Sequence, residues 1–280
     1  MRGISLKKNI VILLVAALLL AVPGVGLAGS LDQFKSLEGT IDIAGGTAHI
    51  PVMKDAAQQI MAVNPKIRIT VAGGGSGVGV QKVGAGLVAI GNTGRALTPE
   101  EIAKYGLKTF SFAIDGVAVA VNPQNPVKAL TAQQVRDIFA GKITNWKAVG
   151  GKDAAINLFT RDEASGTREV FWKKALKKGP IADKANVVAS NGAMKVAVAQ
   201  DPNAIGYVGI GHLDATVVGV KLDGVEPTQE NAKSGKYPVL RLLYMNTKGD
   251  PTPLVKAFID YIKSPEGAKL TAKHGYIPTP

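Results

Sequence analysis

Short apolar runs alternate with segments of helical periodicity along most of the chain. The run TIDIA, residues 40–44, predicts a strand, and so does IRITVA, residues 67–72, which ends in glycine. Between these two runs, the segment after Pro51 has apolar side chains at helical spacing, namely Met53, Ala57, Ile60 and Met61. A strand, a glycine-containing turn and a helix in repetition are typical of a parallel sheet with helical crossovers, so we expect an α/β fold.

Two apolar runs are longer than this repeating pattern requires. They are TFSFAIDGVAVAVNP, residues 109–123, and YPVLRLLYMNT, residues 237–247. Two long extended segments that bracket a middle portion indicate a discontinuous first lobe and an inserted second lobe. We therefore expect lobe 1 to comprise residues 29–114 and 240–280, and lobe 2 to comprise residues 115–239.

The first residues of the chain have the pattern of an export signal. Three basic residues precede an apolar run over residues 10–22, and small residues follow up to Ala28. The run is shorter than the roughly 20 residues that a membrane-spanning helix needs. We therefore predict a signal peptide over residues 1–28, cleaved after Ala28, and prefer it to a retained membrane anchor.

The composition indicates the compartment in which the protein is located and the kind of partner that it binds. Removal of 28 residues from 280 leaves 252, which is enough for two lobes with sizeable cores. The chain has no cysteine, and an export signal without a disulfide or a lipid-bearing cysteine favours a soluble periplasmic protein. The formal net charge of +12 becomes +9 when the three basic residues of the signal are subtracted. The basic residues are scattered and aromatic residues are few, so we expect attraction for anions and no nucleic-acid binding.

Three glycine-rich corners each follow a predicted strand and precede a helix. They are Gly45-Gly46-Thr47-Ala48, Gly73-Gly74-Gly75-Ser76-Gly77 and Ser165-Gly166-Thr167. In α/β sheets, ligands collect at the carboxyl ends of strands, where the next helix presents free N–H groups. Each corner combines glycine, which allows close backbone approach, with a hydroxyl donor. A turn followed by an N-cap is the alternative explanation for any one corner, but the three together favour an anion-binding cleft.

Arg161 ends the strand that precedes the third corner. Its forked N–H donors suit two oxygens of one anion. The alternative is a surface salt bridge to Asp162 or Glu163. Hydrogen bonds to a charged group contribute roughly 1.5–3 kcal/mol each, so a handful of them around one anion is enough for tight binding.

No motif in the chain indicates catalysis, a metal or a nucleotide. There is no G-x-x-x-x-G-K-[ST] loop, and the near-match to a dinucleotide fingerprint at residues 84–89 follows a predicted helix. Ser76 lacks the second flanking glycine of a nucleophile elbow. The three histidines share no metal-ligand spacing, although His49 lies beside the first corner. A hydrolase that used Ser165 would need a base or a metal, and the chain offers no such cluster, so we predict a non-enzyme without a cofactor or metal.

Several segments together are similar to one protein family. They are GGTAHIP, GGGSGVGVQKV, TRDEASGTREVF, DPNAIGYVG, KSGKYPVLRLLYMNTKG and SPEGAKLTAKHGYIP. The combination of R-x-x-x-S-G-T with IGYVG and GKYP is highly specific, and the similarity extends over essentially all of the mature chain. The protein resembles the phosphate-binding proteins of bacterial phosphate ABC transporters. The resemblance implies a periplasmic binding protein of type II, in which two α/β lobes joined by two hinge strands close on dehydrated phosphate.

The resemblance also implies the ligand-binding residues. Arg161 is the expected charged clamp, and Glu163 matches an acidic position that orients it. The other expected ligands are hydroxyls and backbone N–H groups of the corners and of the third strand, namely Gly46, Thr47, Ala48, Ser76, Gly77, Thr93, Gly94, Ser165, Gly166 and Thr167. Ala48 stands where the family usually has a hydroxyl, so it offers only its N–H.

The segment Asn92-Thr93-Gly94-Arg95 departs from the family pattern. The family commonly has two hydroxyl residues there, or an aspartate in the second place that accepts the proton of hydrogen phosphate. A buried carboxylate of this kind repels sulfate, so it discriminates between the two anions. Gly94 has no such group. Asp115, in the first long strand, is the candidate replacement, and a buried hinge aspartate bonded to nearby backbone is the alternative.

We therefore predict a receptor that captures inorganic phosphate in the periplasm and passes it to the permease subunits of an ABC transporter, acting as a monomer. Gly94 keeps open a second reading, in which the same fold binds sulfate or molybdate. A secreted phosphatase or hydrolase is the alternative from another class. A further alternative is a receptor whose closed form also reports to a signalling partner.

Overall fold

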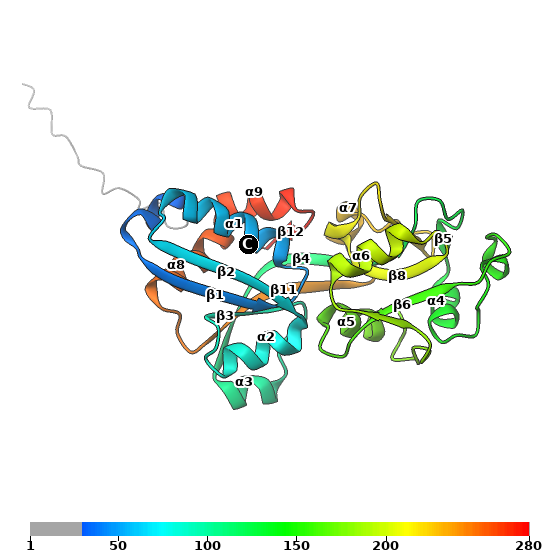
Figure 1. Ribbon diagram of the computed structural model, residues 1–280, viewed down its shortest axis with the longest axis horizontal. Helices are drawn as coiled ribbons and strands as arrows, with labels where there is room; N and C mark the ends of the chain where they lie inside the picture. Colours follow the sequence, from blue (N-terminus) through cyan, green and yellow to red (C-terminus); the bar gives the residue numbers. More distant parts are fainter. Residues whose placement is uncertain (1–29, 280) are drawn as a thin grey trace, which may run out of the picture.

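One mixed sheet runs through both halves of the molecule. The computed structural model describes residues 30–279, and the predicted signal peptide lies outside them. The strands are hydrogen-bonded in the order β2 (Ile67–Gly74), β1 (Gly39–Gly45), β3 (Ile90–Thr93), β11 (Leu240–Lys248), β4 (Leu107–Val121), β8 (Ala204–Gly209), β6 (Asn157–Arg161) and β7 (Asn186–Val188). Two short strands, β9 (Val218–Gly219) and β12 (Ile277–Pro278), also pair with β4. Figure 1 shows two lobes joined where β4 and β11 run between them.

The long strands β4 and β11 correspond to the two long apolar runs of the sequence. They pair antiparallel from Leu107 opposite Lys248 to Gly116 opposite Leu240. Beyond this point β4 continues into the second lobe, where residues 117–121 pair with β8. One strand therefore belongs to the sheets of both lobes, and the change of partner at Gly116 marks the place where the lobes are connected.

The first lobe is built on the parallel strands β1, β2 and β3. Helices α1 (Ile50–Val63), α8 (Pro253–Lys263) and α9 (Pro265–Lys273) lie on one side of this sheet, and α2 (Gly75–Gly84) and α3 (Pro99–Tyr105) lie on the other (Figure 1). The main core brings together both ends of the described chain, from Phe34 in the 3-10 helix η1 (Leu31–Ser36) to Tyr276. Along β4 this core stops at Ala113.

The second lobe is built on β6, β7, β8 and the end of β4. Its helices are α4 (Ala132–Phe139), α5 (Gly166–Lys174), α6 (Asn191–Gln200) and α7 (Gln229–Lys233), and its smaller elements are β5 (Ala129–Leu130), β10 (Lys221–Leu222), η2 (Trp146–Val149) and η3 (Ile210–His212). Phe171 stacks on Tyr207 with ring centroids 4.2 Å apart, and Phe139 packs edge-on against Phe171. The core of this lobe begins on β4 at Val117 and includes Val239, so each lobe has its own apolar interior.

Side-chain caps fix the first turn of helices α3, α5 and α6. Thr98 forms a capping box with Glu101 at the start of α3. Ser165 caps α5 and Ser190 caps α6, each by accepting a hydrogen bond from a backbone N–H of the first turn. These caps satisfy N–H groups that a helix leaves unpaired at its beginning. Within residues 30–279, none of the helices is long and apolar enough to cross a membrane.

Candidate functional site

The three glycine-rich corners of the sequence meet in one cavity between the lobes. The first lobe lines it with Gly46, Thr47, Ala48, His49, Gly75, Ser76 and Gly94, and the second lobe and strand β11 line it with Arg161, Ser165, Gly166, Thr167 and Arg241. The space open to the centre of a water molecule is only about 10 Å³. The cavity is therefore small, and its wall brings groups of both lobes close together.

The second corner shows why its position requires glycine. Gly75 has a φ of 87°, in the left-handed region that favours glycine. A Cβ atom at Gly75 would lie 2.6 Å from the carbonyl oxygen of Ala164, which belongs to the other lobe. The N–H of Gly77 donates to the same oxygen at 3.0 Å. The beginning of α2 is thus in direct contact with the Ser165 corner, and the two lobes are closed on each other.

The third corner forms the N-terminus of α5. Ser165 is the N-cap, and its Oγ accepts a hydrogen bond from the N–H of Arg168 at 3.1 Å. Gly166 and Thr167 are the first two helical residues, so their N–H groups have no partner within the helix. Together with the positive end of the helix dipole, these groups suit a negatively charged ligand.

Two backbone carbonyls fix the side chain of Arg161, and one of its two terminal nitrogens remains available to a ligand. Its side chain is buried, its Nε donates to Val188 O at 2.8 Å, and its Nη2 donates to Ala189 O at 3.0 Å. Its Nη1 is buried and, within residues 30–279, has no hydrogen-bond partner. Burial lowers the pKa of Arg161, and the nearby Asp162 opposes that change. The guanidinium remains charged at neutral pH because arginine is not deprotonated in proteins.

Glu163 does not occupy the place expected of it. Its side chain is exposed, and within residues 30–279 no hydrogen bond or ion pair joins it to Arg161. The two carbonyls at the end of β7 orient the guanidinium instead. The contact that the family resemblance implied is not made, because the turn after β6 directs the Glu163 side chain into solvent.

Asn191 links the lobes and was not foreseen from the sequence. Its backbone N–H and its Nδ2 both donate to Thr47 Oγ1, at 3.2 and 3.0 Å, and the same Nδ2 lies 3.2 Å from Thr167 Oγ1. Thr47 belongs to the first lobe, whereas Thr167 and Asn191 belong to the second. The side chain is fully buried, and its Oδ1 accepts from the N–H of Gly209. Since no motif surrounds Asn191, only its position at the start of α6 brings it here.

Two predicted ligand residues stand just outside the cavity wall. The N–H of Gly77 is used by Ala164, as described above. Thr93 is buried, and its Oγ1 accepts from Asn246 at 3.1 Å. The neighbouring Gly94 does line the cavity, and its N–H donates to Ser76 Oγ at 2.9 Å. Gly94, directly after β3, therefore forms part of the cavity wall. Thr93, the last residue of β3, lies outside the wall and is bonded to Asn246.

Arg241 is a second cavity-lining arginine that the motif analysis missed. Its Nε and Nη2 donate to Asp115 Oδ2 at 2.9 and 2.7 Å, and its Nη1 donates to Thr167 Oγ1 at 2.8 Å. Asp115 does not line the cavity and lies directly opposite Arg241 in the β4–β11 register. Burial raises the pKa of Asp115, and Arg241 opposes that rise. The available signal was a lone charged residue within each long apolar run, because charges buried in a sheet are normally paired.

His49 also lines the cavity, beside the first corner. Its Nδ1 lies 3.1 Å from Gly46 O and its Nε2 lies 3.1 Å from Tyr244 O. Burial lowers the pKa of His49 to about 3, and Arg241 adds to this effect. The ring is therefore neutral at physiological pH, and it supports the first corner from a fixed position between two carbonyls.

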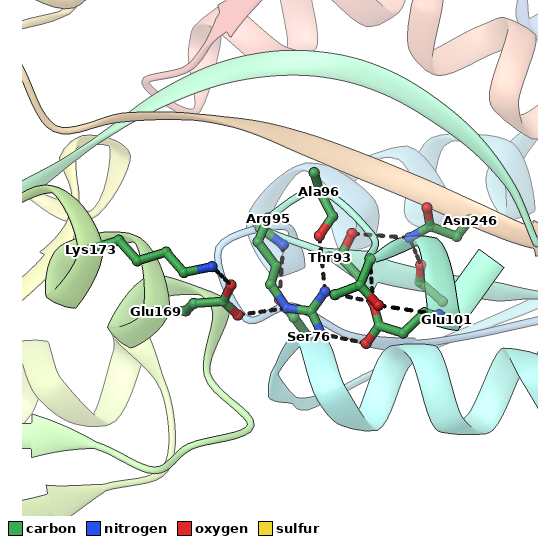
Figure 2. A network of polar contacts seen from close by, with 11 residues as sticks. Ser76, Thr93, Arg95, Ala96, Glu101, Glu169, Lys173 and Asn246 are labelled. Atoms are coloured by element: carbon green, nitrogen blue, oxygen red, sulfur yellow. Dashed lines mark hydrogen bonds and ion pairs between the residues drawn. The ribbon is translucent and has the colours of Figure 1, made fainter. Parts of the chain in front are cut away.

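An ion-pair network joins the two lobes outside the cavity (Figure 2). Arg95, in the loop after β3, binds both carboxylate oxygens of Glu101 in its own lobe, at 2.8 and 2.6 Å. Its Nε reaches Glu169 Oε2 of α5 at 2.8 Å, and Glu169 Oε1 accepts from Lys173 at 2.6 Å. Figure 2 shows Arg95 between the two carboxylates, so this arginine connects the lobes outside the cavity. Within residues 30–279, no group of three or more histidine, aspartate or glutamate side chains is placed to hold a metal ion.

Comparisons with known proteins agree with this geometry. A family model of the PBP superfamily domain matches residues 35–266. The phosphate-binding protein PstS of Bacillus subtilis (strain 168) is 38% identical over 286 residues, covering 98% of this chain and 95% of that protein. A substrate-binding protein from Clostridium perfringens, solved with bound phosphate, is 36% identical with a TM-score of 0.81 over 86% of this chain and 100% of its own. An ABC-type phosphate transport receptor from Vibrio cholerae is 35% identical with a TM-score of 0.68 over 86% of this chain and 100% of its own.

The fold and the cleft define a periplasmic binding protein of the two-lobed type II class, as the sequence predicted. The chain belongs to the PBP superfamily and, within it, to the PstS family of phosphate-binding proteins.

Proposed function

We propose that this protein binds inorganic phosphate in the cleft between its lobes and delivers it to the permease subunits of an ABC transporter in the inner membrane. The single observation that carries the proposal is the buried Nη1 of Arg161, which finds no hydrogen-bond partner in the described part of the chain, while Arg161 lines a cavity walled by hydroxyls and a helix N-terminus. A buried guanidinium nitrogen is stabilised by a charged acceptor, and a tetrahedral anion supplies several acceptor oxygens at once. The phosphate-binding names of the relatives support the choice of phosphate.

In this proposal, closure of the lobes around the ligand is the signal that the permease recognises. Both lobes supply donors to the same small cavity, so a ligand satisfies all of them only when the lobes are closed. A ligand that binds the closed form more tightly shifts the protein toward that form. The direct bonds from Asn191 to Thr47 and from Gly77 to Ala164 then hold the lobes together around the ligand. We infer that the permease recognises this closed form.

Calorimetric titration of the mature protein tests the proposal. The protein is first unfolded, washed and refolded to remove any bound ligand, and its thermal unfolding is recorded to establish that it is folded. We expect tight one-to-one binding of phosphate and a rise in the unfolding temperature with phosphate concentration. A folded protein that shows neither heat of binding nor thermal stabilisation by phosphate refutes the proposal.

A second candidate function is a receptor for sulfate or molybdate on the same fold. The observation that favours it is the cavity wall at Gly94, which carries no carboxylate, together with the position of Asp115 outside the cavity. A site that pairs with a ligand hydrogen rejects an analogue that lacks it by about 10⁴-fold or more. Titration with phosphate in the presence of sulfate, and then of molybdate, separates the candidates: an anion that binds more tightly than phosphate is the ligand.

Hydrolysis is not supported by the surroundings of Ser165. Its Oγ accepts from the N–H of Arg168, and within residues 30–279 no histidine or carboxylate accepts a hydrogen bond from its hydroxyl. A serine nucleophile needs such a base. We therefore propose a binding protein without catalytic activity, and turnover of a chromogenic phosphate ester that disappears in Ser165→Ala is the result that contradicts this view.

We further propose that the protein is exported, cleaved after Ala28 and active as a monomer in the periplasm. The lobes are proposed to divide at residues 114/115 and 239/240. The separation of the two cores supports this division, since one ends on β4 at Ala113 and the other begins at Val117. N-terminal sequencing of the exported protein, light scattering and limited proteolysis with phosphate present or absent test these statements.

A further inference from the structure

Arg241 brings a second guanidinium to the wall of the cleft. It comes from the hinge strand β11, its side chain is 2% exposed, and it lines the same cavity as Arg161. Asp115 accepts from its Nε and Nη2, and Thr167 Oγ1 accepts from its Nη1. Each terminal nitrogen of a guanidinium carries two hydrogens. The bond to Thr167 uses one hydrogen of Nη1, so the other is left for a ligand.

The absence of a side chain at Gly94 provides the space that the Arg241 guanidinium occupies. A Cβ atom at Gly94 would lie 2.7 Å from Nη1 and 3.3 Å from Cζ of Arg241. Since Asp115 and Thr167 hold the guanidinium and the interior is closely packed, Arg241 has nowhere to move. The backbone of Gly94 gives no other reason for a glycine, because its φ lies outside the left-handed region. The absence of a side chain at residue 94 and the presence of Arg241 are therefore two parts of one arrangement.

We propose that Arg241 is a second ligand-binding cation of the cleft, that Asp115 positions it, and that Gly94 is the residue that makes space for it. This inference rests on the proposed function to the extent that the ligand is an anion. Asp115 in this arrangement holds Arg241 in place and does not receive a proton from the ligand.

The consequence is a cleft wall whose side chains present donors to the ligand. Thr47 and Thr167 already accept from Asn191, Ser76 accepts from Gly94, and Ser165 accepts from Arg168. Hydroxyls that accept from fixed protein donors keep their own hydrogens for the ligand. Among residues 30–279 no carboxylate lines the cavity, and that of Asp115 lies beyond Arg241. The side chains therefore recognise the negative charge of the ligand, and Arg241 adds a second fixed positive charge to that of Arg161.

A variant that removes the buried pair tests the role of Arg241. Arg241→Met alone leaves a buried carboxylate without its partner, which strongly destabilises the fold, so the informative variant combines Arg241→Met with Asp115→Leu. Replacement of a buried ion pair by apolar residues of similar volume is often neutral for stability. We expect the double variant to fold and to bind phosphate about 10- to 100-fold more weakly than the native protein. Arg68→Met, which removes an exposed positive charge on β2, serves as the charge control and is expected to change the affinity less than about twofold.

Gly94→Ala, made in the native protein and in the double variant, tests whether Gly94 makes space for the Arg241 guanidinium. Gly94→Ala should weaken phosphate binding by at least about tenfold in the native protein, because the new Cβ displaces the guanidinium. In the background that lacks Arg241, the same substitution should change the affinity by less than about threefold. Gly192→Ala, at a helical glycine where a Cβ would have only one ordinary contact, controls for the general effect of alanine.

The possible results separate this inference from the proposed function. Failure of the native protein to bind phosphate refutes the proposed function. If the native protein binds phosphate and the folded double variant binds it equally well, Arg241 has a structural role only and the inference is overturned. An equal loss from Gly94→Ala in the two backgrounds overturns the assignment of Gly94.

Discussion

Arg95 of the first lobe and Glu169 of the second lobe form an ion pair between the lobes, with 2.8 Å between Nε and Oε2. Their side chains are 13% and 27% exposed, so solvent screens the pair only in part. Glu101 binds the opposite side of Arg95 and holds the guanidinium in position toward the second lobe. The pair exists only while the lobes are closed, so it stabilises the closed form independently of the ligand.

Glu169→Gln should therefore weaken phosphate binding by about two- to fivefold, which corresponds to an ion pair of at most about 1 kcal/mol. The loss should shrink at high salt, because salt screens the native pair. Calorimetric titration at low and high ionic strength measures both effects. Glu163→Gln is the matched control, since Glu163 is an exposed glutamate on the same lobe. Equal losses in the two variants would show that the Arg95 contact has no specific role.

Arg161→Met should cost more than about 2 kcal/mol of phosphate affinity, roughly 30-fold, because hydrogen bonds from a charged donor to a charged acceptor are lost. Arg161 also binds two backbone carbonyls of the second lobe, so unfolding by urea must be measured beside the titration. Arg68→Met again provides the comparison for loss of one positive charge. A folded Arg161→Met protein with affinity within threefold of native would refute the assignment of Arg161 as the clamp.

Ser165→Ala and Ser264→Ala form a matched pair of cap deletions. Each serine accepts from a backbone N–H three residues later, at 3.1 Å in α5 and 3.2 Å in α9. Loss of an N-cap costs about 1 kcal/mol of stability, so both variants should be similarly destabilised without ligand. Only Ser165→Ala should also lose phosphate affinity, by about fivefold, because only Ser165 lines the cavity. Urea unfolding without phosphate and calorimetric titration give the two readouts, and an affinity loss in Ser264→Ala would contradict the interpretation.

The stability of the protein should fall as the pH decreases from about 6.5 toward 4. Burial lowers the pKa of His49 to about 3 and that of His212 to about 4, from an ordinary value of 6.5. Between the folded and unfolded pKa values only the unfolded state is protonated, so stability that is present above pH 6.5 is lost on acidification. Each histidine contributes a slope of up to about 1.4 kcal/mol per pH unit. Urea unfolding as a function of pH should show a shallower slope in His49→Gln, and an unchanged slope would refute the buried neutral state of His49.

Much of the fold follows from local patterns that the sequence contains. The apolar runs and helical spacings predict alternating strands and helices, and the two long runs correspond to β4 and β11. The corners at Gly46, Ser76 and Ser165 were predictable because a glycine and a hydroxyl between a strand and a helix form a local motif. Their convergence in one cavity follows from the rule that ligands gather at the carboxyl ends of parallel strands.

The expectation for Glu163 shows the limit of short-range reasoning. One residue separates Arg161 from Glu163 in the chain, and the resemblance to the family implied a contact between their side chains. The turn after β6 directs the glutamate toward solvent, while carbonyls of Val188 and Ala189, from a neighbouring strand, orient the arginine. Sequence proximity near a turn does not fix the direction of a side chain, whereas strand pairing does.

The sequence by itself determined the class of fold, the three corners and Arg161, because each depends on residues that are neighbours along the chain. Only the tertiary structure decided the roles of Arg241, Asp115 and Asn191. Arg241 meets Asp115 through the register of two antiparallel strands that are more than a hundred residues apart, and Asn191 reaches Thr47 only when the lobes close. Hydrogen bonds of this kind are set by packing between distant segments, so no local pattern encodes them.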